Sequence, residues 1–255
     1  MKKFLAYAAV PLSVFGVVYA FEPDLGFATI FSLSALVAVL IATWIEKTIK
    51  SSGKEWANRL SYSFTKKHKE YNIDTKRFIY EYKGNKEYVF TKEYIIVPNC
   101  SDLDRMSDRF AWSAPSGEAK ISSIVSKHEI NRTWKKEFWT YFSVYFNETC
   151  HKGQHYDVKV KIDNLIDKEN NAVPFVSAQI DRKTKLLNLI VKIPKEFKPR
   201  DAQLKVFNGS HRCYDEEIHS ENLEYDETIK GFQCKIKYPR IGRKYVISWN
   251  FTKDT

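Results

Sequence analysis

The sequence contains few glycines and cysteines, and it lacks the short motifs that mark common catalytic sites. Only 9 of its 255 residues are glycine and 4 are cysteine. It has no glycine-rich phosphate loop, no G-x-S-x-G elbow and no H-E-x-x-H pair, so nothing in it points to a phosphate-loop enzyme, an α/β-hydrolase or a zinc protease. We therefore predict no enzyme activity, no catalytic residue and no cofactor.

Metal-binding spacing is missing as well. Cys150 is followed by His151 and His155, but this polar stretch has no second pair of ligands at a recognisable spacing. We interpret it as a solvated turn and predict no metal site. In a reducing cytoplasm the cysteines stay thiols, and Cys234 is expected to be buried because it lies in an apolar stripe. The four cysteines are Cys100, Cys150, Cys213 and Cys234.

Two uncharged runs lie near the N-terminus. Phe4–Phe21 has 18 residues and Leu25–Ile45 has 21, and a spanning helix needs about 20 predominantly apolar residues. Trp44 stands where an interfacial aromatic belongs, and Pro11 is compatible with a kinked membrane helix. The sequence therefore predicts a transmembrane helical hairpin over residues 1–45.

Charge next to these runs predicts the orientation of the hairpin. Lys2 precedes the first run and Lys47 follows the second, whereas the join carries Glu22 and Asp24. Because positive residues concentrate on the cytoplasmic side, both termini of this multi-pass membrane protein are expected in the cytoplasm. A cleaved signal peptide ending at Ala20 is the alternative. Five N-x-S/T sequons keep an exported β domain open: Asn99, Asn131, Asn147, Asn208 and Asn250.

The remaining chain changes from helical to two-residue periodicity. Residues 46–70 are predicted to form a basic amphipathic juxtamembrane linker, in which Trp56, Leu60 and Phe64 share one helical face. It would lie on anionic lipid or pack as a stalk. From residue 71 to residue 255, apolar and polar residues alternate in runs separated by turn-forming residues. This pattern predicts a mainly-β cytoplasmic domain, an antiparallel barrel or sandwich.

Basic and aromatic side chains occur together on several of the expected strands. Arginine binds phosphate in a bidentate manner and aromatic faces stack on bases, so the mixture suits a nucleotide or another flat anion. Extended nucleic acid is not expected, because the basic residues form no long uninterrupted track. The competing interpretation is an ordinary strand composition with a solvated lysine face. The predicted ligand-binding residues are Arg109, Trp112, Lys120, Arg132, Trp134, Trp139 and Tyr141.

This layout of two close N-terminal spans, a short acidic turn and a β-rich domain resembles the two-transmembrane, β-rich effectors of bacterial anti-phage signalling, as in CBASS and related systems. The resemblance implies a barrel that senses a cyclic di- or oligonucleotide, and spans that form a homo-oligomer and disrupt the lipid bilayer of the bacterial inner membrane, where the protein would be located. Whether the ligand activates or inhibits stays open. Small residues would permit close helix packing. The predicted membrane residues are Pro11, Gly16, Ala28, Ser32, Ala35, Ala38 and Trp44.

A second class of function fits the same composition. The protein would then be a membrane-tethered adaptor without pore activity, and its basic β domain would bind an acidic protein partner or anionic lipid. An adaptor should tolerate replacement of its hairpin by an unrelated one, whereas an effector should not.

Overall fold

The computed structural model describes Val37 and residues 70–112, 119–136, 139–166, 174–197, 199–209 and 216–251, without the side chain of Arg132. The chain divides into two units, Met1–Ala57 and Asn58–Thr255. Apart from Val37, all described residues belong to the second unit, and the fold below is that of this unit alone.

The described part of the second unit consists of strands and one short 3-10 helix, η1, and the predicted mainly-β character is confirmed. The strands are β1 (Tyr71–Gly84), β2 (Glu87–Pro98), β3 (Leu103–Ala111), β4 (Lys120–Ser123), β5 (His128–Lys136), β6 (Trp139–Cys150), β7 (Tyr156–Ile166), β8 (Phe175–Gln179), β9 (Thr184–Lys192), β10 (Pro199–Asn208), β11 (Glu217–Asn222), β12 (Gly231–Lys237) and β13 (Arg243–Phe251), with η1 (Lys195–Phe197) between β9 and β10.

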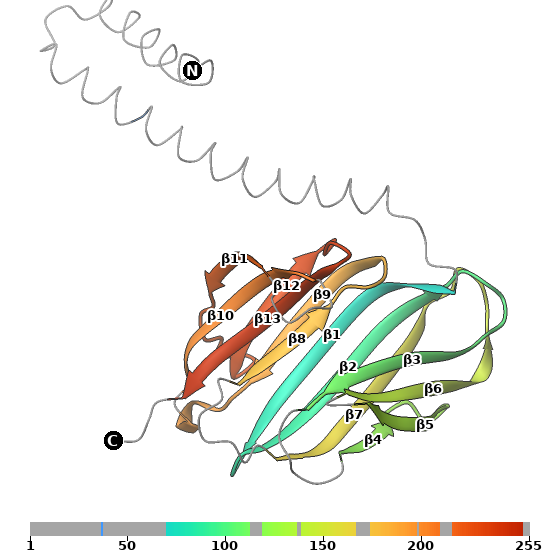
Figure 1. Cartoon of the computed structure of the whole chain (residues 1–255), viewed down its shortest axis with the longest axis horizontal. Helices are drawn as coiled ribbons and strands as arrows, with labels where there is room; N and C mark the ends of the chain where they lie inside the picture. Colours follow the sequence, from blue (N-terminus) through green and yellow to red (C-terminus); the bar gives the residue numbers. More distant parts are fainter. Residues whose placement is uncertain are drawn as a thin grey trace, which may run out of the picture. The chain divides into compact units, whose positions relative to one another are not determined.

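The strands form three sheets around one apolar core (Figure 1). The large sheet has the order β12-β9-β1-β2-β7-β4, the four-stranded sheet β11-β10-β13-β8 and the three-stranded sheet β3-β6-β5. The two smaller sheets pack on the same face of the large one. Lys92 of β2 bonds Asp108 of β3, and the ring of Tyr80 on β1 lies 5.5 Å from that of Trp249 on β13. The arrangement is therefore layered, as in a sandwich.

One pair of strands departs from the expected antiparallel order. β1 and β9 run parallel, with Phe78 opposite Leu189 and Tyr80 opposite Val191. The chain leaves the large sheet after β7, forms β8 in the four-stranded sheet and returns as β9. A crossover of this kind can bring two strands together in the same direction, whereas a tight hairpin cannot.

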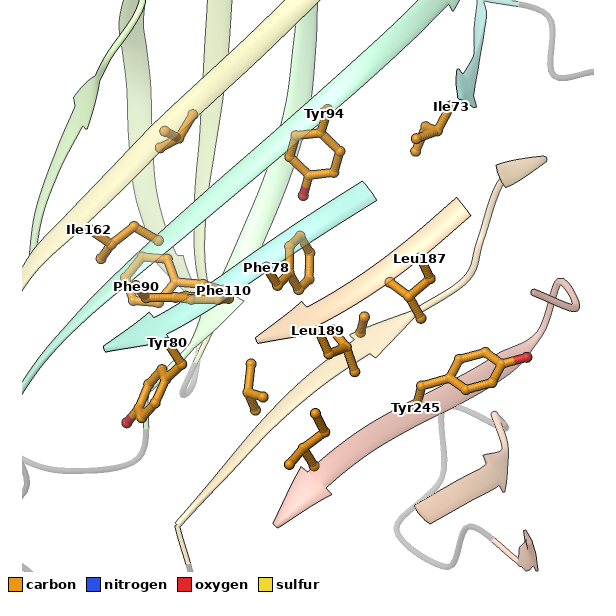
Figure 2. Close-up of a cluster of buried hydrophobic side chains, with 14 of the residues drawn as sticks. Ile73, Phe78, Tyr80, Phe90, Tyr94, Phe110, Ile162, Leu187, Leu189 and Tyr245 are labelled. Carbon is orange, nitrogen blue, oxygen red and sulfur yellow. The ribbon is translucent and has the colours of Figure 1, made fainter. Parts of the chain in front are cut away.

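The two-residue alternation predicted from the sequence determines which side chains form the core. Phe78 and Tyr80 of β1, Phe90 and Tyr94 of β2, and Leu189 of β9 are all buried on the inner face of the large sheet (Figure 2). Cross-strand partners share a face, so the register aligns these side chains into one apolar layer. The alternation expected from residue 71 onward is present in the burial patterns of β7, β12 and β13, and the predicted burial of Cys234 is confirmed at 7% exposure.

The predicted transmembrane hairpin and inner-membrane location require correction. No helix in the described ranges is long and apolar enough to span a bilayer. Apart from Val37, the described residues form strands and one 3-10 helix, whereas a spanning helix needs about 20 predominantly apolar residues in succession. The mainly-β part of the fold-class prediction is confirmed, and the helical hairpin and the inner-membrane location are not kept, because no described helix supports them.

Several predictions fall outside the described residues. The predicted hairpin, residues 1–45, lies outside them except for Val37. The predicted linker, residues 46–70, lies outside them except for Glu70. The signal-peptide alternative at Ala20 and the thiol of Cys213 also lie outside them. The same holds for the predicted membrane residues Pro11, Gly16, Ala28, Ser32, Ala35, Ala38 and Trp44.

Gly231 begins β12 at a place where two backbones approach closely. A Cβ atom there would lie 1.9 Å from the carbonyl oxygen of Val191 and 2.9 Å from Cα of Lys192. Because backbone must move to admit it, Gly231→Ala should lower the free energy of unfolding by about 1–3 kcal/mol. Urea unfolding measures the change, and Lys235→Ala, at an exposed position of the same strand, serves as the control. Equal stability of the two variants would contradict the expectation.

Candidate functional site on the three-stranded sheet

The outward face of the three-stranded sheet collects arginine and tyrosine. On β3, Met106, Asp108 and Phe110 point toward the large sheet, so the residues between them point away. The register places Arg105 opposite Tyr145, Ser107 opposite Ser143 and Arg109 opposite Tyr141. Strand β5 adds four residues opposite these. We call this surface the Arg–Tyr face: Arg105, Ser107, Arg109, Glu129, Asn131, Trp134, Lys136, Trp139, Tyr141, Ser143 and Tyr145.

Arg109 lies against two aromatic rings of this face, one of which stacks on a third. Its guanidinium carbon lies 4.3 Å from the ring centroid of Trp139 and 5.9 Å from that of Tyr141. Its Nη1 donates to the Tyr141 hydroxyl at 3.4 Å. On the other side of Tyr141, Trp134 stacks with centroids 5.2 Å apart and planes 8° apart. Across the three strands, the order is therefore Arg109 on β3, Tyr141 on β6 and Trp134 on β5. Trp134 is 49% exposed.

A second arginine–tyrosine pair lies four residues away on the same strands. Arg105 Nη1 donates to the Tyr145 hydroxyl at 3.3 Å, and its guanidinium carbon is 5.8 Å from that ring. At a rise of about 3.4 Å per residue, the two arginines leave the backbone about 14 Å apart. Ser107 and Ser143, whose hydroxyls are 3.3 Å apart, lie between the two pairs. The sequence reasoning missed Arg105 and Tyr145, although their alternation with Arg109 and Tyr141 was a readable signal.

Four of the seven predicted binding residues meet on the Arg–Tyr face: Arg109, Trp134, Trp139 and Tyr141. Two of the other three, Trp112 and Lys120, lie elsewhere. Trp112 turns inward, where its ring lies 6.0 Å from Tyr88 and 6.5 Å from Tyr80. Lys120 belongs to β4 of the large sheet. The side chain of Arg132 lies outside the described part of the chain, at a register irregularity between Asn131 and Trp134.

A charged cluster lies beneath the Arg–Tyr face. Lys92, 3% exposed, donates from Nζ to Asp108 Oδ2 at 2.8 Å and to the carbonyl oxygen of Arg109 at 2.6 Å. Tyr94 donates its hydroxyl to the same carboxylate oxygen at 2.5 Å. A second buried lysine, Lys76, donates to the carbonyl of Gln179 on β8 at 2.8 Å.

Burial and neighbouring charges shift the pKa values of Lys92 and Asp108 in opposite directions. Burial disfavours the ammonium form and lowers the pKa of Lys92, although the Asp108 charge opposes this shift. Burial also opposes ionisation of Asp108. The charges of Lys92 and Lys76, with hydrogen bonds from Lys92 and Tyr94, outweigh burial and hold the pKa of Asp108 below its usual range. Asp108 is therefore a carboxylate at neutral pH.

The structure places Cys150 and His155 of the polar stretch considered above. Burial raises the pKa of the Cys150 thiol to about 11, so it is protonated and poorly nucleophilic at neutral pH. His155 Nε2 lies 3.2 Å from Asp74 Oδ2 at the surface. No group of three or more His, Cys, Asp or Glu side chains among the described residues has a geometry that would hold a metal ion.

No family model matches this chain, and no curated protein matches its sequence significantly. The geometry of the Arg–Tyr face is therefore the basis for a functional proposal.

Proposed function

We propose that the β domain binds a compact anion with flat rings, such as a cyclic di- or oligonucleotide, on the Arg–Tyr face. In an anti-phage response of the kind carried out by the resembling effector family, this binding is the sensing step. The proposal concerns recognition of the ligand and assigns no chemical reaction to the domain.

The observation that carries the proposal is the placement of Arg109. Its guanidinium rests 4.3 Å from the Trp139 centroid, beside the stacked rings of Tyr141 and Trp134. No carboxylate of the described residues forms an ion pair with Arg109, so its charge is available to a ligand. Arginine binds phosphate oxygens through its planar fork. Stacking of a base on an aromatic ring contributes about 1–3 kcal/mol, and the half-exposed Trp134 offers such a ring.

The charge balance of the face supports an anionic ligand. Its basic members are Arg105, Arg109 and Lys136, and its single acidic member is Glu129. Exposed charges are screened beyond about 8 Å at 0.15 M salt. Binding should therefore weaken as salt is raised, in the manner expected for phosphate contacts.

Calorimetry with the full-length chain and a panel of cyclic di- and trinucleotides tests the proposal. One or more ligands should release heat, and Arg109→Ala should weaken their binding about 10- to 100-fold, because a hydrogen bond to a charged group contributes about 1.5–3 kcal/mol. The matched control is Arg77→Ala. Arg77 lies on the large sheet and pairs with Glu93 at 3.1 Å, so its loss should leave affinity unchanged.

Two results would overturn the proposal. One is the absence of heat from every nucleotide in the panel. The other is equal loss of affinity in Arg109→Ala and Arg77→Ala, with both variants folded by circular dichroism. Poly-glutamate binding that needs Arg109, without nucleotide binding, would replace the proposal by the adaptor function and its acidic protein partner.

A further inference from the structure

Lys92 occupies an interior position surrounded by aromatic rings. Its ammonium lies 4.9 Å from the ring centroid of Phe78, 5.7 Å from that of Phe90 and 5.8 Å from that of Phe142. Removing an ammonium from water is costly, and a buried ion pair is often no more stabilising than well-packed apolar residues. General stability is therefore a weak explanation for this lysine, and the groups that it contacts suggest a more specific role.

Both hydrogen bonds of Lys92 go to consecutive residues of β3. One reaches the side chain of Asp108, which points inward, and the other reaches the main-chain carbonyl of Arg109, whose side chain points outward. Among the described strands, β3 is at the edge of its sheet and pairs only with β6. Lys92 thus ties this edge strand to β2 of the large sheet at the residue that carries the guanidinium.

The position of the Arg109 backbone decides where its guanidinium stands. The 4.3 Å contact with Trp139 and the 3.4 Å bond to Tyr141 both depend on it. Binding geometry is sensitive to displacements of about 1 Å when the supporting contacts are loosened. A contact from the interior to the main chain of Arg109 can therefore affect the outer face without touching a ligand.

We propose that Lys92, together with Asp108 and Tyr94, is a positioning residue for Arg109 of the Arg–Tyr face. The interior cluster holds β3 in place, and the outer face presents the aligned arginine. The consequence for ligand affinity rests on the proposed function, whereas the effect on the Arg109 side chain does not.

The first experiment is NMR of the arginine Nε–H groups in the full-length, nitrogen-15-labelled chain. Trp139 should shift the Arg109 signal by its ring current, and Arg109→Lys assigns the signal by removing it. In Lys92→Met, which keeps the length of the side chain and loses its hydrogen bonds, this signal should move toward that of a freely rotating arginine.

Lys76→Met is the matched control. Lys76 is also buried and also lies near the Phe78 ring, at 5.2 Å, but its hydrogen bond goes to Gln179 on β8 and not to β3. The Arg109 signal should stay in place in this variant. An unchanged signal in folded Lys92→Met, or an equal shift in Lys76→Met, would overturn the proposal.

A milder variant keeps the test decisive if Lys92→Met does not fold. Tyr94→Phe removes only the hydroxyl that donates to Asp108 and retains the ring. It should displace the Arg109 signal in the same direction by a smaller amount. No displacement in Tyr94→Phe would then count against the proposal.

The second experiment is a double-mutant cycle by calorimetry, with cyclic di-AMP as the probe. Lys92→Met should weaken binding about 10-fold in the wild-type background, which is within the coupling range of residues in one network. It should have no effect in an Arg109→Ala background. Equal losses in both backgrounds would indicate a general structural role and reject positioning. If the probe does not bind wild type, the proposed function fails for that ligand, and NMR still decides the role of Lys92.

Discussion

Replacing Trp249 with alanine is expected to lower the free energy of unfolding by about 3–5 kcal/mol, the usual range for a buried tryptophan. The Trp249 side chain is fully buried, and its ring packs 5.5 Å from Tyr80 across the two layers. Alanine would leave a large cavity where the four-stranded sheet meets the large sheet. Urea unfolding followed by far-ultraviolet circular dichroism measures the change.

Two further variants separate packing from other effects. Trp249 Nε1 is buried without a hydrogen-bond partner in the described structure, so Trp249→Phe loses volume but no hydrogen bond and should cost less than Trp249→Ala. Trp134→Ala removes the same side chain from the outer face, where it is 49% exposed, and should cost far less than Trp249→Ala. A Trp134→Ala variant as unstable as Trp249→Ala would contradict the assignment of the core.

Asp108→Ala is expected to lower the free energy of unfolding by about 3–5 kcal/mol, because breaking a buried pair leaves an uncompensated charge. The remaining charge is that of Lys92, whose side chain is 4% exposed. The double variant Lys92→Met, Asp108→Leu removes both charges and should recover most of the loss. A loss in the double variant equal to that in Asp108→Ala would show that the charge imbalance is not the cause.

The pH dependence of stability provides a second measurement on the same pair. The pKa of Asp108 is lower in the folded chain than in the unfolded chain. The unfolded state therefore binds more protons in acid, and the stabilisation by Asp108 is present above about pH 4 and is lost as pH falls through the folded pKa. The double variant has no Asp108, so its free energy of unfolding should fall less than that of wild type as pH is lowered through this range. Equal acid slopes in wild type and the double variant would contradict the predicted shift.

Residue periodicity was sufficient to predict a mainly-β domain, but not every strand: β11, which has no buried residue, was not predicted. In β7, Val158, Val160 and Ile162 alternate with polar residues, and all three are buried as expected. The pattern is local, because each side chain alternates between two faces whatever the neighbouring strands are. It contains no information on the order of strands, and the parallel pairing of β1 and β9 could not be predicted from it.

The candidate site was only partly predictable for the same reason. Arg109 and Trp112 are three residues apart, and alternation places them on opposite faces. The prediction grouped them by composition, and the structure sends Trp112 into the core and Arg109 to the outer face. Lys92 was missed. It alternates with Phe90 and Tyr94 on β2 and so shares their inward face. A lysine on an inward face needs a polar partner, and this signal could have been found in the sequence.

By itself, the sequence determined that this chain builds alternating strands with one apolar and one polar side, because periodicity and strand propensity act over neighbouring residues. Only the tertiary structure decided which polar groups meet. Asp108 becomes the partner of Lys92 when the three-stranded sheet packs on the large sheet, and Trp134 stacks on Tyr141 when β5 pairs with β6. Such contacts depend on strand register and layer packing, which no local pattern specifies.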